Sequence, residues 1–390
     1  MKMIPRLSLL AALVLCLAGF SAFASDTGHY VITNDDVPPK LLNGISIFSI
    51  APNGQLAFQE SVRPGGNGIG GGFFGMNRIR VTNTGGATCV YFSEANDSEI
   101  VGLVLPSGNV GGIVTGSVGD TGTSNGIGLA LNSQYLYASF SDSNTIGTFQ
   151  LDSGCGLTFV GDISVSGLQG GIIDAMAVHG DMLIATYGDG SIESFNIAGG
   201  IPVPNGDEQN STAAIAAQGA TYPSAVDITS DGHFAIFGDT STAAVVEVSD
   251  ISSGLLTKTV VYQSTAGISS SNVMLSPDET LLYVASTQDD RIGAAFFDKT
   301  TGKLSPGCAS GFLTGYVQNF SYLSGLALAN NTGNGGELYV AEFGPVNAIA
   351  EIRVSSQGGH CTLHEAPGSP VVDQYSPGLL SIGSFPPRSF

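Results

Sequence analysis

A pattern of short apolar strands and tight turns repeats along the whole chain. Its clearest copy, residues 271–306, reads SNVMLSPDETLLYVASTQDDRIGAAFFDKTTGKLSP. Three apolar runs alternate with a P-D-E-T turn and an acidic turn, and a T-T-G-K turn leads into a fourth run. Runs of this length separated by turn residues are typical of antiparallel β-strands. The copy therefore predicts a four-stranded antiparallel meander.

The same order of strands and turns recurs, which predicts a seven-bladed β-propeller of four-stranded antiparallel blades. Further copies occupy residues 78–114, 128–162, 174–200, 224–261 and 325–365. The seventh copy is split, because residues 29–62 contain three strands without the innermost one. We expect a C-terminal strand, Gly378 to Phe385, to supply it, with Leu379 or Ile382 buried. Such closure of the ring removes free sheet edges.

Composition agrees with an all-β fold class. Glycine accounts for 55 of the 390 residues and tryptophan is absent. This is about twice the usual share of glycine, and tight turns explain it because the collagen period is missing. We find no helical spacing of apolar residues that is not also readable as strand.

The first 24 residues have the pattern of a secretory signal peptide. Lys2 and Arg6 precede the apolar run LSLLAALVLCLAGF, and an A-F-A motif ends at residue 24. A membrane anchor needs about 18 to 20 apolar residues, usually followed by basic residues, whereas a serine and an aspartate follow here. We therefore expect residues 1–24 to be removed and residues 25–390 to form one secreted domain, extracellular or periplasmic.

The chain is strongly acidic, with 12 Lys and Arg against 32 Asp and Glu and a net charge of −20 at pH 7. A surface of this charge repels nucleic acid and anionic membranes, and no basic cluster interrupts it. We expect no nucleic-acid partner and no membrane partner, and we expect a monomer.

Four cysteines lie outside the predicted signal peptide: Cys89, Cys155, Cys308 and Cys361. An even number in an exported chain permits two disulfides, and sequence alone leaves three pairings open. Pairs between neighbouring blades are geometrically the simplest, which favours Cys89 with Cys155 and Cys308 with Cys361. No C-x-x-C pair is present, so we predict no metal site and no cofactor.

Residues 63–75, RPGGNGIGGGFFG, contain the pattern G-x-G-x-x-G. In a dinucleotide-binding fold a strand precedes this pattern and a helix follows it, whereas here a strand, a turn and another strand follow. The tetrapeptide NGIG also recurs at residues 125–128. We interpret the glycines as a connection between blades one and two, where permissive backbone angles allow close approach. Binding of a ligand by the loop amides is the alternative.

Several segments resemble the YVTN and lactonase-like seven-bladed β-propellers, namely YVITND, SPDETLLYVAS and ELYVAEFG. That group includes fungal 3-carboxymuconate lactonising enzyme and bacterial 6-phosphogluconolactonase. The resemblance implies an exported lactonase or lactone-forming cycloisomerase, similar to carboxymuconate cyclase, that acts on a small carboxylate or lactone. The polar N-R-G-H and N-E segments of the lactonising relatives are not matched, because the equivalent places read STQDDR and SFSDSN. The alternative is a non-catalytic secreted propeller that binds a protein or glycan partner through the loops of one face.

An acid occupies the turn between the second and third strands of every predicted blade. These acids are Asp35, Glu94, Asp142, Asp189, Asp239, Asp289 and Glu342. The turns share one face, which we call the top face, with the loops between blades. The acids are expected to line a ligand-binding mouth there, or to cap turn amides, as aspartate often does.

The chain has few arginines, and several of them are catalytic candidates. A lactonase needs a group that stabilises a carboxylate or an oxyanion, and arginine suits that role. We select Arg63 in the glycine loop, Arg78, which starts the inner strand of blade two together with Arg80, and Arg291 after the acidic turn of blade six, with Glu94 as acid or base. Histidines fall on the opposite face or outside the ring, so no Ser-His-Asp triad is expected.

Overall fold

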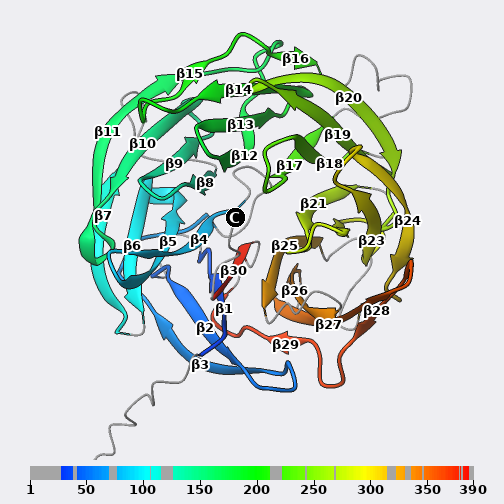
Figure 1. Cartoon of the computed structure of the whole chain (residues 1–390). Coiled ribbons are helices and arrows are strands. Elements are labelled where there is room, and N and C mark those ends of the chain that lie inside the picture. Colours follow the sequence, from blue (N-terminus) through cyan, green and yellow to red (C-terminus); the bar gives the residue numbers. More distant parts are fainter. Residues whose placement is uncertain are drawn as a thin grey trace, which may run out of the picture.

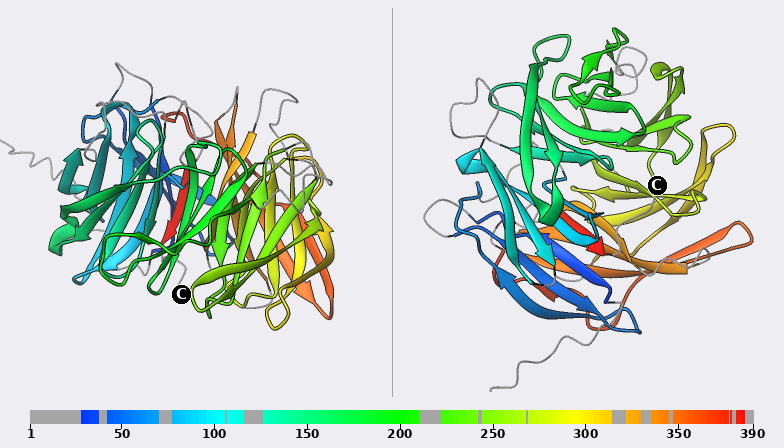
Figure 2. Two further views of the ribbon diagram at one scale, coloured as in Figure 1. Left: turned by 90° about the horizontal axis from the view of Figure 1, so that it is seen from above. Right: turned by 60° about the vertical axis from the view of Figure 1, so that its left-hand side comes forward.

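The computed structural model describes residues 28–37, 42–69, 77–105, 107–115, 126–210, 222–241, 244–267, 269–313, 322–329, 335–344, 347–376, 378 and 381–385. In this part of the chain seven antiparallel sheets surround a central axis (Figure 1). Figure 2 shows these blades standing side by side around the axis. The predicted seven-bladed, all-β propeller is therefore confirmed.

The strands of each blade follow one another from the axis outward. Blade one contains β30 (Ser381–Phe385), β1 (Tyr30–Asn34), β2 (Ile45–Ile50) and β3 (Leu56–Val62). Blade two contains β4 (Ile79–Thr84), β5 (Ala87–Glu94), β6 (Glu99–Leu105) and β7 (Asn109–Thr115). Blade three contains β8 (Ile127–Leu131), β9 (Tyr135–Phe140), β10 (Thr145–Leu151) and β11 (Leu157–Ser164). Blade four contains β12 (Ile173–His179), β13 (Met182–Tyr187) and β14 (Ser191–Asn196), and the short strands β15 (Val203–Pro204) and β16 (Gln209–Asn210) both pair with β14.

The remaining three blades repeat this order. Blade five contains β17 (Pro223–Ile228), β18 (Phe234–Asp239), β19 (Val245–Ser252) and β20 (Leu255–Gln263). Blade six contains β21 (Ser270–Leu275), β22 (Leu281–Ser286), β23 (Arg291–Asp298) and β24 (Lys303–Ala309). Blade seven contains β25 (Tyr322–Ala329), β26 (Gly335–Phe343), β27 (Ala348–Gln357) and β28 (His360–Glu365), and β29 (Val371–Val372) also pairs with β27. Two short 3-10 turns, η1 (Ala95–Asp97) and η2 (Ser153–Cys155), complete the described elements.

The hydrophobic core lies between adjacent blades. In β13, for example, all six residues are buried, because neighbouring blades cover both faces of the strand. A strand covered on both faces reads as a continuous apolar run rather than an alternation, as LYVAS does in β22. One cluster joins Tyr91 of blade two to Leu129 and Phe140 of blade three, so each blade is stabilised by the next.

The ring closes within blade one, as predicted. Strand β30 pairs antiparallel with β1, and Tyr30 lies opposite Phe385 while Asn34 lies opposite Ser381. Ile382 is buried in the cluster that joins blades seven and one, and Leu379 lies outside the described residues. A strap of chain, residues 366–376, connects β28 to this last strand and carries β29 (Figure 1).

Two disulfides join neighbouring blades. Cys89 of β5 is bonded to Cys155 of η2, and Cys308 of β24 is bonded to Cys361 of β28. The predicted pairing is confirmed. No helix in the described part of the chain is long and apolar enough to span a membrane. The predicted signal peptide, residues 1–24, lies outside the described residues, so its removal stays a prediction.

Candidate functional site

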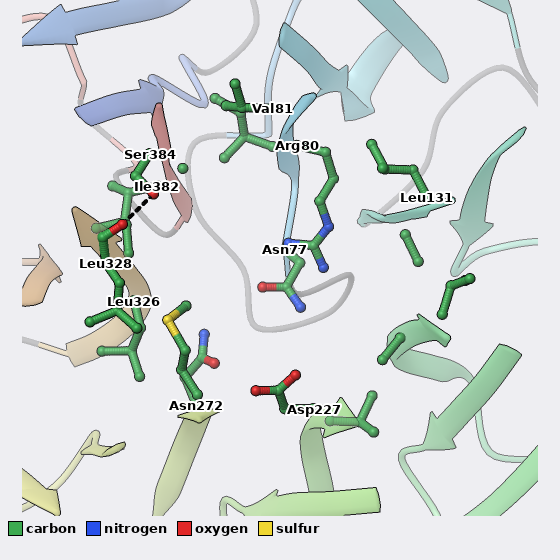
Figure 3. Close-up of a pocket in the computed structure, with 18 of the residues that line it drawn as sticks. Asn77, Arg80, Val81, Leu131, Asp227, Asn272, Leu326, Leu328, Ile382 and Ser384 are labelled. Atoms are coloured by element: carbon green, nitrogen blue, oxygen red, sulfur yellow. Dashed lines mark hydrogen bonds between the residues drawn. The ribbon is translucent and has the colours of Figure 1, made fainter. Parts of the chain in front are cut away.

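The inner strands of the seven blades enclose a cavity of about 250 Å³ on the axis (Figure 3). Most of its wall is aliphatic, with side chains such as Val81, Leu131 and Leu328. Polar side chains enter from four of the inner strands and from Asn77, two residues before β4. They are Asn77, Arg80 and Thr82 of blade two, Asp227 of blade five, Asn272 of blade six and Ser384 of blade one. An apolar pocket with a few convergent polar groups is the usual form of a small-molecule site.

Arg80 provides the positive charge of this cavity. It is the second residue of β4, and its guanidinium group extends into the open space (Figure 3). In the described part of the chain no hydrogen bond or ion pair to this group is found. Burial lowers the pKa of Arg80 to about 10, and the Asp227 carboxylate opposes that shift. Arg80 therefore stays charged at neutral pH and presents its N–H donors to the cavity.

Asp227 lies on β17, across the cavity from Arg80 (Figure 3). One carboxylate oxygen accepts the backbone N–H of Ile228 at 2.9 Å, and the other accepts the N–H of Leu275 at 2.8 Å. These two bonds fix the carboxylate against the junction of blades five and six. Asp227 therefore places a carboxyl group in the cavity wall, across from Arg80.

Two amides and the hydroxyls of Thr82 and Ser384 complete the polar wall. Asn77 has a positive φ of 64°, and its backbone carbonyl accepts the N–H of Leu129 at 3.1 Å, which fixes the residue at the start of blade two. Asn272 enters from the inner strand of blade six. The Ser384 hydroxyl donates to the carbonyl of Leu328 at 2.7 Å (Figure 3). The site thus offers both donors and acceptors beside one guanidinium and one carboxylate.

Arg78, a predicted catalytic residue, lies outside the cavity wall. Its guanidinium forms an ion pair with Asp36, and both side chains are 2% exposed. Its backbone N–H donates to the Ser381 hydroxyl at 3.1 Å. Asp174 of β12 is fully buried nearby; burial raises the pKa of this carboxyl well above its usual value, and the Arg78 charge opposes the shift. Arg78 therefore connects blades one and two.

The glycine loop binds carboxylates of the chain itself. Backbone N–H groups donate from Gly66 to Glu94 at 3.2 Å, from Asn67 to Asp97 at 2.7 Å and from Ile69 to Asp36 at 3.1 Å. These contacts support the structural interpretation for the described part of the loop, residues 63–69. They also bury Glu94, the predicted acid or base, whose pKa rises to about 7, mainly through burial and then through Glu99.

The other two predicted arginines also lie away from the cavity. Arg63 is exposed, and its guanidinium lies 5.5 Å from the ring centroid of Tyr375. Arg291 lies with its guanidinium 4.4 Å from the ring centroid of Phe312, at the junction of blades six and seven. None of the four predicted catalytic side chains lines the cavity. The alternation in I-R-V-T contains the missed signal, because Ile79 and Val81 pack between blades one and two and so direct Arg80 to the axis.

The predicted top-face acids are held in separate local networks. Asp189 accepts the N–H groups of Gln169, Gly171 and Ser191, while Asp239 accepts those of Tyr222 and Ser241. These bonds fit the capping interpretation. Asp142 is exposed, and Asp289 lies beside Gly267. Among the described residues no group of three or more His, Cys, Asp or Glu side chains is arranged to hold a metal ion.

Two of these acids, Asp35 and Glu342, have raised pKa values because they are buried near other carboxyl groups. The Thr33 hydroxyl lies 2.9 Å from a carboxylate oxygen of Asp35 and 2.9 Å from one of Asp373, in the strap. The two carboxyl groups therefore share one hydroxyl donor and lie close to each other. Burial, with the Asp373 charge, raises the pKa of Asp35 to about 7. Burial, with Asp290 and Glu365, raises that of Glu342 to about 8.

The fold and the axial cavity define a seven-bladed β-propeller with an internal small-molecule pocket. The family model described as Lactonase, 7-bladed beta-propeller matches residues 117–367. The chain belongs to this lactonase family, which confirms the resemblance found in the sequence. No curated protein matches the chain.

Solved structures with the same fold include two candidate 6-phosphogluconolactonases. The protein from Bacteroides fragilis has a TM-score of 0.62 at 15% identity, and the match covers 93% of this chain and 99% of that one. The protein from Bacteroides uniformis has a TM-score of 0.64 at 15% identity, with 92% and 99% covered. A Lactobacillus plantarum protein matches with a TM-score of 0.52 at 15% identity, with 88% and 82% covered. At this identity the likeness shows the fold alone.

Proposed function

We propose that this protein is an exported lactonase, or a lactone-forming cycloisomerase of the carboxymuconate cyclase kind, that binds a small carboxylate or lactone in the axial cavity. The observation that carries the proposal is the Arg80 guanidinium, which faces the cavity beside a carboxylate and has no hydrogen bond within the described residues. Membership of the lactonase family supports the class of substrate. The two disulfides support export, since such bonds persist in oxidising compartments.

The cavity provides the parts that lactone hydrolysis needs. A water molecule adds to the lactone carbonyl, and Asp227 accepts its proton. The guanidinium of Arg80 stabilises the oxyanion of the tetrahedral intermediate. The ring C–O bond then breaks, and the protonated Asp227 returns the proton to the leaving alkoxide, which gives the hydroxy acid. No cofactor enters this sequence, in which the lactone and one water are converted to the product.

An assay of the purified protein on sugar lactones, acyl lactones and 3-carboxymuconate tests the proposal. Arg80→Gln removes the charge from the cavity and should lower kcat/KM by roughly 10² to 10³, as loss of an oxyanion donor does. Arg353→Gln on β27 is the matched control, because Arg353 is exposed on the outside of blade seven and should leave turnover unchanged. Absence of turnover above the blank, or an Arg80→Gln variant as active as the parent, would contradict it.

A second candidate function is binding of a protein or glycan through the top face. Its support is a set of exposed apolar side chains in top-face connections: Leu42 is 53%, Leu168 53% and Phe312 68% exposed. Exposed apolar side chains mark a binding surface where they form a contiguous patch. Binding to a glycan array or to surface proteins that Phe312→Ser abolishes, in a protein without lactone turnover, would favour this function over catalysis.

A further inference from the structure

Asn77 has an uncommon backbone conformation at the wall of the axial cavity. Its φ is 64°, in the left-handed region. Nine described residues other than glycine have a positive φ, and Asn77 is the one among them that lines this cavity. Asparagine adopts the conformation more readily than most residues, whereas glycine adopts it without steric cost. The side chain, rather than the backbone, therefore accounts for an asparagine at this position.

The left-handed conformation lets Asn77 and Arg80 reach the same space. Side chains three residues apart point to opposite faces of an extended strand. Asn77 lies two residues before β4, and its positive φ interrupts the extended course of the chain there. Figure 3 shows that its amide and the Arg80 guanidinium both extend into the cavity. Blade two thus presents a neutral donor and a charged donor to the cavity.

Contacts with two neighbouring blades fix the backbone around Asn77. Its carbonyl accepts the N–H of Leu129 at 3.1 Å, and Leu129 is 1% exposed in the cluster that joins blades two and three. The next residue, Arg78, is held by its ion pair with Asp36 on the side of blade one. The Asn77 amide is therefore carried by a backbone that is anchored on both sides, as a preorganised hydrogen-bond donor must be.

The amide and the guanidinium can bind the same kind of ligand atom. An asparagine amide has two N–H donors, and a guanidinium has five. The oxyanion that forms when water adds to a lactone carbonyl can accept several of these donors. Sites that stabilise such oxyanions commonly combine two donors, and asparagine side chains are among them. Two fixed donors on one wall of the cavity have this composition.

Resting on the proposed function, we infer that Asn77 is a second oxyanion donor, which binds the same ligand oxygen as Arg80 through its amide N–H. The carbonyl oxygen of the lactone lies between the two donors, carries the negative charge after water adds, and becomes one oxygen of the product carboxylate. Asn77 gains and loses no proton in this sequence. It acts by hydrogen bonding alone.

Asn77→Gly tests this role, because glycine keeps the positive φ and removes the amide. The variant should lower kcat/KM by roughly 10², as loss of one oxyanion donor does. The value of kcat should fall as well, since the oxyanion forms only after the substrate has bound. Asn144→Gly is the matched control, because Asn144 has a φ of 50° and lies between β9 and β10, outside the cavity lining. Melting curves of both variants should resemble that of the parent.

Two further variants distinguish a donor from a residue that only fills space. Asn77→Asp keeps the shape and tolerates the positive φ, but its carboxylate repels an oxyanion. Its activity relative to the parent should rise as the pH falls, because a protonated carboxyl group can donate a hydrogen bond. When Arg80→Gln is combined with Asn77→Gly, the loss of kcat/KM should be smaller than the product of the two single losses, because both donors act on one oxygen.

The outcomes separate the inference from the function on which it rests. If the parent is active and Asn77→Gly is equally active, the role of Asn77 is overturned and the proposed lactonase stands. The role is also overturned if the loss of activity comes with a matching fall in melting temperature, or if the single losses multiply in the double variant. A parent protein without turnover on any lactone removes the proposed function, and the role of Asn77 with it.

Discussion

The glycine loop after blade one binds anions with its amides, and these anions are carboxylates of the same chain. Gly66, Asn67 and Ile69 donate to Glu94, Asp97 and Asp36. A methyl group added at Gly66 would overlap the Glu94 carboxylate. The G-x-G-x-x-G pattern therefore has the physical chemistry of an anion site, although its partners are internal.

Gly66→Ala should lower the free energy of unfolding by about 1 to 3 kcal/mol, because the added methyl group forces the buried Glu94 side chain or the loop to move. Gly199→Ala is the matched control, since nothing lies within 4 Å of a Cβ there. Denaturant unfolding of both variants measures the difference. Equal midpoints would show that the loop is not tightly packed on the carboxylate.

The positions and contacts of single side chains were harder to predict from the sequence than the strands or the fold. The sequence placed Arg78 and Glu94 at a mouth, whereas both are buried in contacts between a blade and a loop. Which of two arginines separated by one residue faces the axis depends on where the strand begins, and β4 begins at Ile79. Arg80 therefore lies within the strand and lines the cavity, whereas Arg78 precedes the strand. The hydrogen-bond partners of an acid in a turn depend on the path of the neighbouring loops. A repeat pattern in the sequence does not specify that path.

At the level of strands the repeat pattern predicted the structure closely. Apolar runs and turn residues identified the blades, and the split copy identified β30 as the closing strand. The strands β16 and β29, which pair with β14 and β27, were not predicted. Each is two residues long, which is too short for a periodic signal. The outer edge of blade four also lies beyond the predicted limit at residue 200, because β15 and β16 form it.

Deleting residues 376–390 should cause aggregation or a large fall in melting temperature. The deletion removes β30, exposes the edge of β1 and takes Ile382 out of its cluster. Burial of a side chain of that size contributes roughly 1.5 to 3 kcal/mol, and an open sheet edge invites pairing with other chains. Deleting residues 386–390 alone is the control, since β30 is kept. Melting curves and light scattering make the comparison, and a monomeric longer truncation with an unchanged melting temperature would argue against closure.

The whole molecule should be more stable in mild acid than in mild alkali. Burial is the largest cause that raises the pKa values of five carboxyl groups: Asp35, Glu94 and Glu193 to about 7, and Asp290 and Glu342 to about 8. In the unfolded chain these groups lose their protons near pH 4. The folded state therefore binds more protons between about pH 4 and 8, so stability falls as the pH rises through this window. Repulsion among the excess negative charges acts in the same direction.

Guanidinium unfolding at pH 5 and pH 8 measures this effect, and the midpoint should be lower at pH 8. A buried carboxyl whose pKa rises from about 4 to about 7 contributes roughly 2 to 3 kcal/mol to the difference between these two pH values. Glu342→Gln, which cannot lose a proton, should reduce the slope. Asp298→Asn is the control, because hydrogen bonds from Thr301 and Thr300 lower the pKa of this exposed group, so it titrates below the window. A flat profile, or higher stability at pH 8, would contradict the assignment of buried protons.

The register of the closing strand decides how the ring responds to mechanical force. Tyr30, at the start of β1, lies opposite Phe385, at the end of β30. Tension applied between the two ends of the chain therefore acts on the same end of one ladder, and it loads the hydrogen-bonded pairs one after another instead of all together. Under such a pull, strands β1 and β30 separate one residue pair after another. The strand pair that closes the ring therefore resists a pull applied through Tyr30 and Phe385 with only one residue pair at a time.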